Sequence, residues 1–273
     1  MQVVFWGARG SISVSGPQFR DFGGNTTCVE VRSGDCRLVL DGGTGIRALG
    51  SEIGFAPSDV TILFTHVHWD HIQGIPFFTP AFNPNNDIRV IGMKREGPGI
   101  KDVLASQMTS PTFPISLDFL RGLKTFEDLE LNSSFRVGPF TVTSVDLNHP
   151  DGVVAYHIEA EGKQVVFATD VEHGGETLDS RLVEISRGVD LLIHDAQYTM
   201  DEYMGRTGPS RQGWGHSSWE EAVELAERAQ VRSLGLFHHD PARDDEGIRT
   251  IEAQAQARFA QSFAVREFQR IDL

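Results

Sequence analysis

Short apolar runs bounded by turn residues recur along the chain and predict β-strands. The predicted strands are Val3–Phe5, Thr27–Arg32, Arg37–Leu40, Val60–Phe64, Ile88–Ile91, Phe140–Val145, Gln164–Ala168, Asp190–Ile193 and Ser233–Phe237. The strands come first in pairs and later alternate with helical segments. This order favours a layered α/β fold with mixed sheets and outer helices.

The clearest helical pattern runs from Trp219 to Gln230. Ser217-Ser218 followed by Glu220-Glu221 is typical of a capping box at its start. Its apolar stripe consists of Ala222, Val223, Leu225, Ala226 and Ala229. A second helix is predicted from about Asp245 to Phe259. Because no repeat, low-complexity tract or linker marks a boundary, the pattern predicts one domain over residues 1–273.

Composition and the first residues of the chain indicate where in the cell the protein is expected. No stretch approaches the ~20 apolar residues that a membrane span requires. The first residues, Met1 to Ser11, lack the basic and apolar regions of a signal peptide. Two cysteines, Cys28 and Cys36, are too few for a disulfide framework and are expected to be reduced. We therefore expect a cytoplasmic protein with no membrane partner.

The formal net charge is −14, from 24 Lys and Arg against 38 Asp and Glu. Proteins that bind long nucleic acids usually present a basic face, because phosphate contacts dominate that affinity. A negative field of this size repels such polymers, whereas a metal site can still attract one small anion. The charge therefore favours a small anionic substrate and disfavours a long nucleic acid.

The motif with the most specific chemistry is His66-Val67-His68-Trp69-Asp70-His71, directly after the strand Val60–Phe64. Three imidazoles and one carboxylate within six residues are typical of a metal site, with a surface chelating patch as the alternative. In a tight loop, the first two histidines project one way and Asp70-His71 turn toward a neighbouring position. One loop can thus serve two adjacent metals. Such nitrogen and oxygen ligands suit Zn²⁺, and also Mn²⁺ or Fe²⁺.

Four predicted strands end on residue types that bind metals, namely Thr65-His66, Asn148-His149, Thr169-Asp170 and Phe237-His238. Strand ends gathered at one edge of a sheet are where α/β folds place their sites. Taken alone, His149 before a proline and Asp170 after a strand would also fit turn or cap roles. His238 and His239 are adjacent, and the register favours His238 as the ligand because it directly follows the strand.

The sequence His-x-His-x-Asp-His after an apolar strand resembles the signature of the metallo-β-lactamase superfamily. The likeness extends over nearly the whole chain. Gly7-Ala8-Arg9-Gly10-Ser11 and Gly23-Gly24-Asn25-Thr26-Thr27 resemble the first hairpin of its phosphodiesterase branch, and Asp41-Gly42-Gly43-Thr44-Gly45 resembles its acidic turn. Gly215-His216-Ser217-Ser218 and Leu236-Phe237-His238 are similar to the C-terminal part of RNase Z-like enzymes. The resemblance implies a four-layer αββα sandwich of two mixed β-sheets.

The resemblance also implies two divalent metal ions, Zn²⁺ first and Mn²⁺ or Fe²⁺ as alternatives. The first metal would be held by His66, His68 and His149, and the second by Asp70, His71 and His238, with Asp170 as the bridge. Two metals that share a water lower its pKa and generate a hydroxide nucleophile. Asp70 would then have a catalytic role as well, as acceptor of the water's proton.

His216 is the further catalytic candidate. In the RNase Z-like branch the matching histidine lies over the scissile phosphate, where it can stabilise charge or protonate the leaving oxygen. The alternative is a loop histidine that packs on Trp214. Asp195 is expected to orient His216, since a carboxylate fixes an imidazole tautomer. Arg9 and His239 are expected to bind the substrate. For Arg9, an exposed position in a turn without contact to the substrate is an equally good interpretation.

The resemblance leaves several superfamily activities to compare. β-Lactamases are exported, and the common zinc forms lack the bridging Asp or use a Cys ligand. A glyoxalase II-type thioester hydrolase, an RNase Z-type tRNA 3′ endonuclease and a non-catalytic metal-bound sensor are the alternatives kept. Between Gly97 and Glu130 there is no long basic arm of the tRNA-processing kind, and this segment suggests a lid or dimer element. We predict a phosphodiesterase for a small phosphodiester, with a 3′,5′-cyclic nucleotide as leading substrate and a homodimer as a compatible state.

Overall fold

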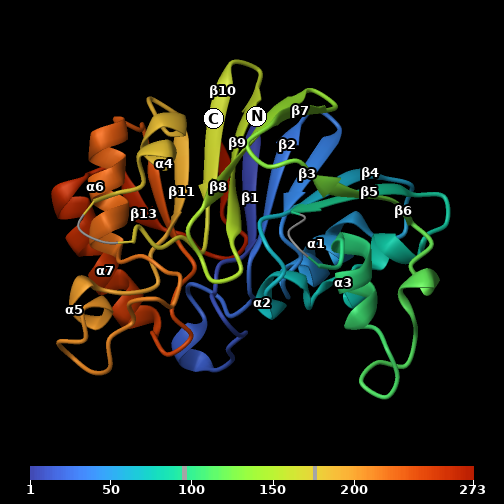
Figure 1. Ribbon diagram of the computed structural model, residues 1–273, viewed down its shortest axis with the longest axis horizontal. Coiled ribbons are helices and arrows are strands. Elements are labelled where there is room, and N and C mark those ends of the chain that lie inside the picture. The colour runs from blue at the N-terminus through green and yellow to red at the C-terminus, as the bar shows by residue number, and fades with distance from the viewer. Residues whose placement is uncertain (94–96, 175–176) are drawn as a thin grey trace.

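The computed structural model describes residues 1–93, 97–174 and 177–273. Within these residues two seven-stranded sheets face each other, and helices lie on their outer faces (Figure 1). This arrangement confirms the predicted αββα sandwich of two mixed sheets.

The first sheet has the order β14-β1-β2-β3-β4-β5-β6, antiparallel from β14 to β3 and parallel from β3 to β6. Its strands are β1 (Gln2–Gly7), β2 (Cys28–Ser33), β3 (Cys36–Leu40), β4 (Asp59–Phe64), β5 (Asp87–Met93), β6 (Leu123–Leu129) and β14 (Arg270–Asp272). The second sheet, β13-β12-β11-β10-β9-β8-β7, has the same division into a parallel and an antiparallel half. Its strands are β7 (Ser134–Val137), β8 (Phe140–Leu147), β9 (Val153–Ala160), β10 (Lys163–Ala168), β11 (Leu191–Asp195), β12 (Leu234–Phe237) and β13 (Ser262–Ala264).

Helices α1 and α3 cover the first sheet, and α4, α6 and α7 cover the second (Figure 1). The α-helices are α1 (Ile46–Ile53), α2 (Trp69–Ile72), α3 (Ile100–Ser106), α4 (Ser180–Ile185), α5 (Met200–Tyr203), α6 (Trp219–Ala229) and α7 (Asp245–Arg258). Short 3₁₀ turns are η1 (Pro17–Phe19), η2 (Ile75–Phe77), η3 (Thr79–Phe82) and η4 (Leu117–Phe119). Among the described helices, none is long and apolar enough to cross a membrane.

Three apolar layers hold the sandwich together. Between the sheets, Phe5, Phe167 and Phe237 are fully buried. The other two layers lie between each sheet and its helices. Burial of such a side chain contributes about 1.5–3 kcal/mol, and most strands are buried on both faces, one against the other sheet and one against helices.

Each predicted strand is present, with ends that differ by at most two residues. The predicted helix after Ser218 is also confirmed, because Ser218 and Glu221 form a capping box at the start of α6. Gln230 then ends the helix in the left-handed conformation, at φ 54°. The helix predicted from Asp245 corresponds to α7.

The segment from Gly97 to Glu130 differs in part from its predicted form. It contains α3, η4 and β6, and Met108, Leu117 and Leu120 are buried in the apolar layer over the first sheet. Residues 109–116, between these anchors, are exposed or half-buried, so the lid or dimer element expected there stays a prediction.

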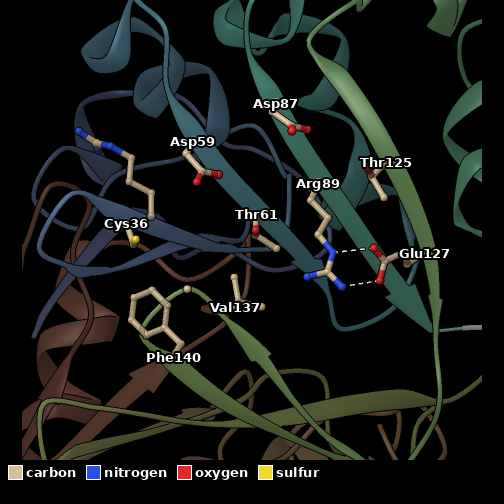
Figure 2. A pocket seen from close by; sticks show the side chains of 11 residues that line it. Cys36, Asp59, Thr61, Asp87, Arg89, Thr125, Glu127, Val137 and Phe140 are labelled. Atoms are coloured by element: carbon tan, nitrogen blue, oxygen red, sulfur yellow. Dashed lines mark hydrogen bonds and ion pairs between the residues drawn. The ribbon is translucent and has the colours of Figure 1, made fainter.

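A polar cavity of about 280 Å³ lies where β3, β4 and β5 begin, beside the turn between β7 and β8. Figure 2 shows Arg89 and Glu127 paired across it, with Asp59 and Asp87 at the strand starts. The residues predicted to bind metals follow the carboxyl ends of the parallel strands instead. The cavity and the candidate site therefore lie at opposite ends of the first sheet.

Candidate metal centre

The histidine-rich loop connects β4 to α2. His66 and His68 lie in the loop, while Asp70 and His71 lie in the first turn of α2. The loop is fixed by backbone bonds, since His71 N donates to His68 O and Gly42 N donates to His71 O. His66, Asp70 and His71 are buried although they are polar.

The predicted ligands form two groups whose ligand atoms lie within 4.8 Å of one another. The first group is His66, His68 and His149, and the second is Asp70, His71, Asp170 and His238. Asp170 faces both groups, because its Oδ1 lies 3.1 Å from His238 Nε2 and its Oδ2 lies 3.7 Å from His66 Nε2. The structure thus brings together all seven residues predicted as ligands.

The spacing of these atoms fits bound cations. Ligands at about 2.1 Å from one Zn²⁺ in a tetrahedron lie about 3.4 Å apart. His68 Nδ1 lies 3.0 Å from His149 Nε2, and His71 Nε2 lies 3.2 Å from Asp170 Oδ1. Asp70 Oδ2 lies 3.3 Å from both His71 Nε2 and His238 Nε2. Each group therefore has the dimensions of one coordination shell.

Buried ring nitrogens give a second test of the fit. His66 Nε2 and His71 Nε2 have no hydrogen-bond partner among the described residues, although both are buried. Buried polar atoms without a partner are rare and call for an explanation such as an ion. Burial and the neighbouring His71 lower the pKa of His66 well below its usual value, so its ring is neutral with a free lone pair. The donor set fits two divalent metals.

The opposite ring nitrogens are held by residues behind the ligands. Asp41 Oδ2 lies 2.9 Å from His71 Nδ1, and Thr65 Oγ1 lies 3.1 Å from His66 Nδ1 while also donating to Asp41. Gln197 Oε1 lies 2.8 Å from His238 Nδ1. Such partners fix the tautomer and the orientation of a metal-binding histidine. Asp41 lies in the acidic turn noted in the sequence, whereas no local signal identified Gln197.

Three residues at strand ends adopt left-handed backbone conformations that are uncommon outside glycine. They are Asp41 at φ 62°, Asp170 at φ 52° and His238 at φ 60°. Such conformations cost of order 1–3 kcal/mol and cluster at functional sites. Here each one turns the chain sharply after a parallel strand, so that the side chain enters the common centre.

His216 and Asp195 are also brought together, with Nδ1 and Oδ2 2.9 Å apart. Asp195 is fully buried and accepts from the backbone N–H groups of Asp170 and Ser217. Burial alone would lower the pKa of His216, but the Asp195 carboxylate raises it to about 9. The ring of His216 stacks on His238, with centroids 4.9 Å apart. The predicted pair therefore lies beside the second group of ligands.

Arg9 and His239 are positioned differently from the prediction. Arg9 is 1% exposed, and its guanidinium donates to the backbone carbonyls of Gly23 and Arg243 at 2.8 and 2.7 Å. His239 Nε2 bonds to Val265 O, and burial lowers the pKa of His239 to about 3. Both side chains tie loops together away from the ligand cluster. The substrate-binding role expected for them is therefore corrected to a structural one.

Glu172 is a buried acid that the sequence did not single out. Its carboxylate accepts from Gly213 N at 2.7 Å, Gly215 N at 2.8 Å and the Tyr203 hydroxyl at 2.7 Å. Gly215 O in turn lies 2.7 Å from His149 Nδ1. Gly215 has φ 87°, and a Cβ there would overlap the ring of His149. Glu172 thus holds the loop that orients both His149 and His216.

Glu172→Gln should weaken the centre without unfolding the chain. An amide oxygen can replace only one of the two carboxylate oxygens that bind Gly213 and Gly215, so one N–H loses its acceptor. We expect about a 10-fold loss of affinity for the metals, the lower end of the range for such supporting residues. Metal titration followed by calorimetry measures it. Glu184→Gln, on exposed α4, is the control, and unchanged affinity in Glu172→Gln would contradict this role.

The fold and the His/Asp centre together define a sandwich of the metallo-β-lactamase type. In agreement, the family described as "Beta-lactamase superfamily domain" matches residues 37–239. Since the match covers most of the chain, the protein belongs to this superfamily.

Individual proteins are more distant. A ribonuclease Z from Haloarcula marismortui is 21% identical, over 87% of this chain and 86% of its own. The metallo-β-lactamase fold protein YhfI from Bacillus subtilis superposes with a TM-score of 0.74 at 19% identity, covering 99% of both chains. A diphosphatase of the PhnP family gives 0.70 at 14% identity, covering 99% of this chain and 96% of that one. At these identities the solved structures show the fold.

Proposed function

We propose that the protein is a metal-dependent phosphodiesterase for a small phosphodiester, with a 3′,5′-cyclic nucleotide as the first substrate to test. The observation that carries the proposal is the pair of ligand groups joined by Asp170, with the His216–Asp195 pair beside them. The ribonuclease Z and diphosphatase names among similar proteins support phosphoester chemistry.

His66, His68 and His149 would hold one metal, and Asp70, His71 and His238 the other, with Asp170 between them. Divalent cations bound there would activate a water molecule and offset the charge that develops on the phosphoryl oxygens. Asp70 Oδ2 also accepts from Ser11 N at 2.7 Å, which holds this carboxylate toward the centre, where it can accept a proton from the attacking water.

His216 would act on the leaving group. Asp195 occupies its Nδ1, so Nε2 is the atom left to donate a proton to the departing oxygen. The imidazole is held between Asp195 and the stacked ring of His238, which limits its rotation. This arrangement supports a general acid of fixed orientation.

RNA is the second candidate substrate. The relatives named ribonuclease Z favour an RNA 3′ endonuclease, and they weaken the exclusion of nucleic acids drawn from charge. The net charge of −14 favours a small substrate, because a polyanion would be repelled. Direct comparison of a cyclic nucleotide with a precursor tRNA decides between them.

The first test is hydrolysis of bis(p-nitrophenyl) phosphate by protein loaded with Zn²⁺ or Mn²⁺. We expect turnover in the wild type and none above background in His66→Ala, because one ligand group is broken. His157→Ala, a histidine on β9 outside both ligand groups, is the matched control and should retain activity. Absence of turnover with either metal would contradict the proposal and make thioesters the next substrates to try.

A further inference from the structure

Trp214 lies two residues before His216 and has an unusual environment for an indole. Its side chain is 52% exposed. The guanidinium of Arg211 lies over the ring, with its carbon 4.4 Å from the centroid. The same guanidinium lies 5.8 Å from the ring of Tyr198, which contacts His216 with centroids 5.9 Å apart. An exposed aromatic surface is therefore held beside the predicted general acid.

Arg211 is also unusual in its charge environment. Its guanidinium forms no ion pair with any described residue, whereas nearby Arg206 is paired with Asp201 at 2.7 Å. In a chain of net charge −14, an arginine without a carboxylate partner near the centre is notable. A guanidinium over an aromatic face is attracted by the negative face of the ring. Arg211 therefore fixes one face of Trp214 and leaves the rest of the ring open to solvent.

Trp69, the other exposed indole of the site, is less well fixed. It is the first residue of α2, between His68 and Asp70, and is 65% exposed. Within the described residues it has no ring or cation contact comparable to that of Trp214. A preorganised ring binds a planar ligand at a lower entropic cost than a free one. The geometry therefore favours Trp214 as the binding surface.

We infer that Trp214, backed by Arg211, is a stacking subsite for the nucleobase on the leaving side of the scissile phosphodiester. This inference rests on the proposed function, because the position of His216 as the proposed general acid defines the leaving side. His216 and Trp214 lie in the same loop with only Gly215 between them, so a leaving group protonated by His216 would depart next to this loop. The substrate class is thus a nucleotide whose base lies on the leaving half.

The test compares AMP with ribose 5-phosphate, which share sugar and phosphate and differ in the base. Calorimetry on the metal-loaded protein measures both affinities without requiring turnover. Base stacking on an aromatic side chain tightens nucleotide binding, so we expect AMP to bind on the order of 10-fold more tightly. Trp214→Ala should remove this preference and leave ribose 5-phosphate unchanged, while Trp214→Phe should retain it. Phe55→Ala, an exposed ring after α1, is the control.

A ribotetranucleotide is the third probe, since a base can belong to a small nucleotide or to RNA. Loss of affinity for the tetranucleotide alone in Trp214→Ala would support the subsite and assign it to RNA. Equal affinity of Trp214→Ala and wild type for both AMP and the tetranucleotide would overturn the inference. If the protein hydrolyses bis(p-nitrophenyl) phosphate but binds AMP no more tightly than ribose 5-phosphate, the subsite is contradicted and the phosphodiesterase proposal stands. A preference for AMP without any hydrolysis of bis(p-nitrophenyl) phosphate would retain the subsite and contradict the phosphodiesterase.

Discussion

Asp170→Asn is expected to reduce the metal content from two ions per chain to one or none, and to lower phosphodiester hydrolysis at least about 10³-fold. The loss corresponds to about 4 kcal/mol of transition-state stabilisation. Asp170 is the one residue whose two oxygens face both ligand groups in the described chain. An amide keeps the shape but removes the negative charge that offsets repulsion between two cations. Elemental analysis of the purified protein and initial rates measure both effects.

Asp87→Asn is the matched control for this variant. Asp87 begins β5 at the end of the first sheet opposite the metal centre, and it is exposed. It should retain two metals and full activity. Circular dichroism establishes that Asp170→Asn is folded before its activity is compared. Two tightly bound metals in a folded Asp170→Asn protein would contradict the bridging role.

His216→Ala should produce the second largest loss, and the loss should depend on the leaving group. Proton transfer by a positioned side chain contributes 10²–10⁴-fold. p-Nitrophenolate is stable as an anion and needs little help, whereas the alkoxide released from a cyclic nucleotide needs a proton. We therefore expect a loss near 10³-fold with the cyclic nucleotide and about 10-fold or less with bis(p-nitrophenyl) phosphate. Rates on both substrates, each with wild type and variant, measure the difference.

Asp195→Asn provides the companion measurement. Asp195 touches His216 Nδ1 directly, so its amide variant should show the same dependence on the leaving group with a smaller amplitude. Equal losses on both substrates in His216→Ala would rule out proton donation and assign His216 to charge stabilisation.

Sequence patterns predicted the strands that combine alternation with clear turn signals. They missed β9, Val153–Ala160, although its β-branched and aromatic residues favour a strand. They also missed β6, Leu123–Leu129, and three short strands, β7, β13 and β14, the last two only three residues long and defined by their partners in the sheet. The strands β13 and β14 form by pairing with strands that are distant in the sequence, and a short stretch of sequence does not reveal such partners.

The residues predicted as ligands could be grouped from the sequence because they lie in the segments that follow strand ends, where sequence position and spatial position coincide. The residues behind them were not. Glu172 and Gln197 act through hydrogen bonds to groups 41 to 43 residues away along the chain. Arg9 was misassigned for the converse reason, since a turn arginine looks exposed until loops 231 to 234 residues distant cover it. The predicted and the observed site therefore differ where a residue's hydrogen-bond partners are distant in the sequence.

Each ligand group draws side chains from both sheets. His66, His68, Asp70 and His71 follow β4 of the first sheet, while His149, Asp170 and His238 follow strands of the second. A cation in either group would therefore cross-link the two sheets, which also meet through apolar packing, the ion pair of the Met1 amino group with Glu161 and the hydrogen bond from the Tyr156 hydroxyl to Phe64 O. Asp70 and His238, 168 residues apart, would share one such link. Metal affinity and the cohesion of the two sheets are thermodynamically coupled, so whatever strengthens one strengthens the other.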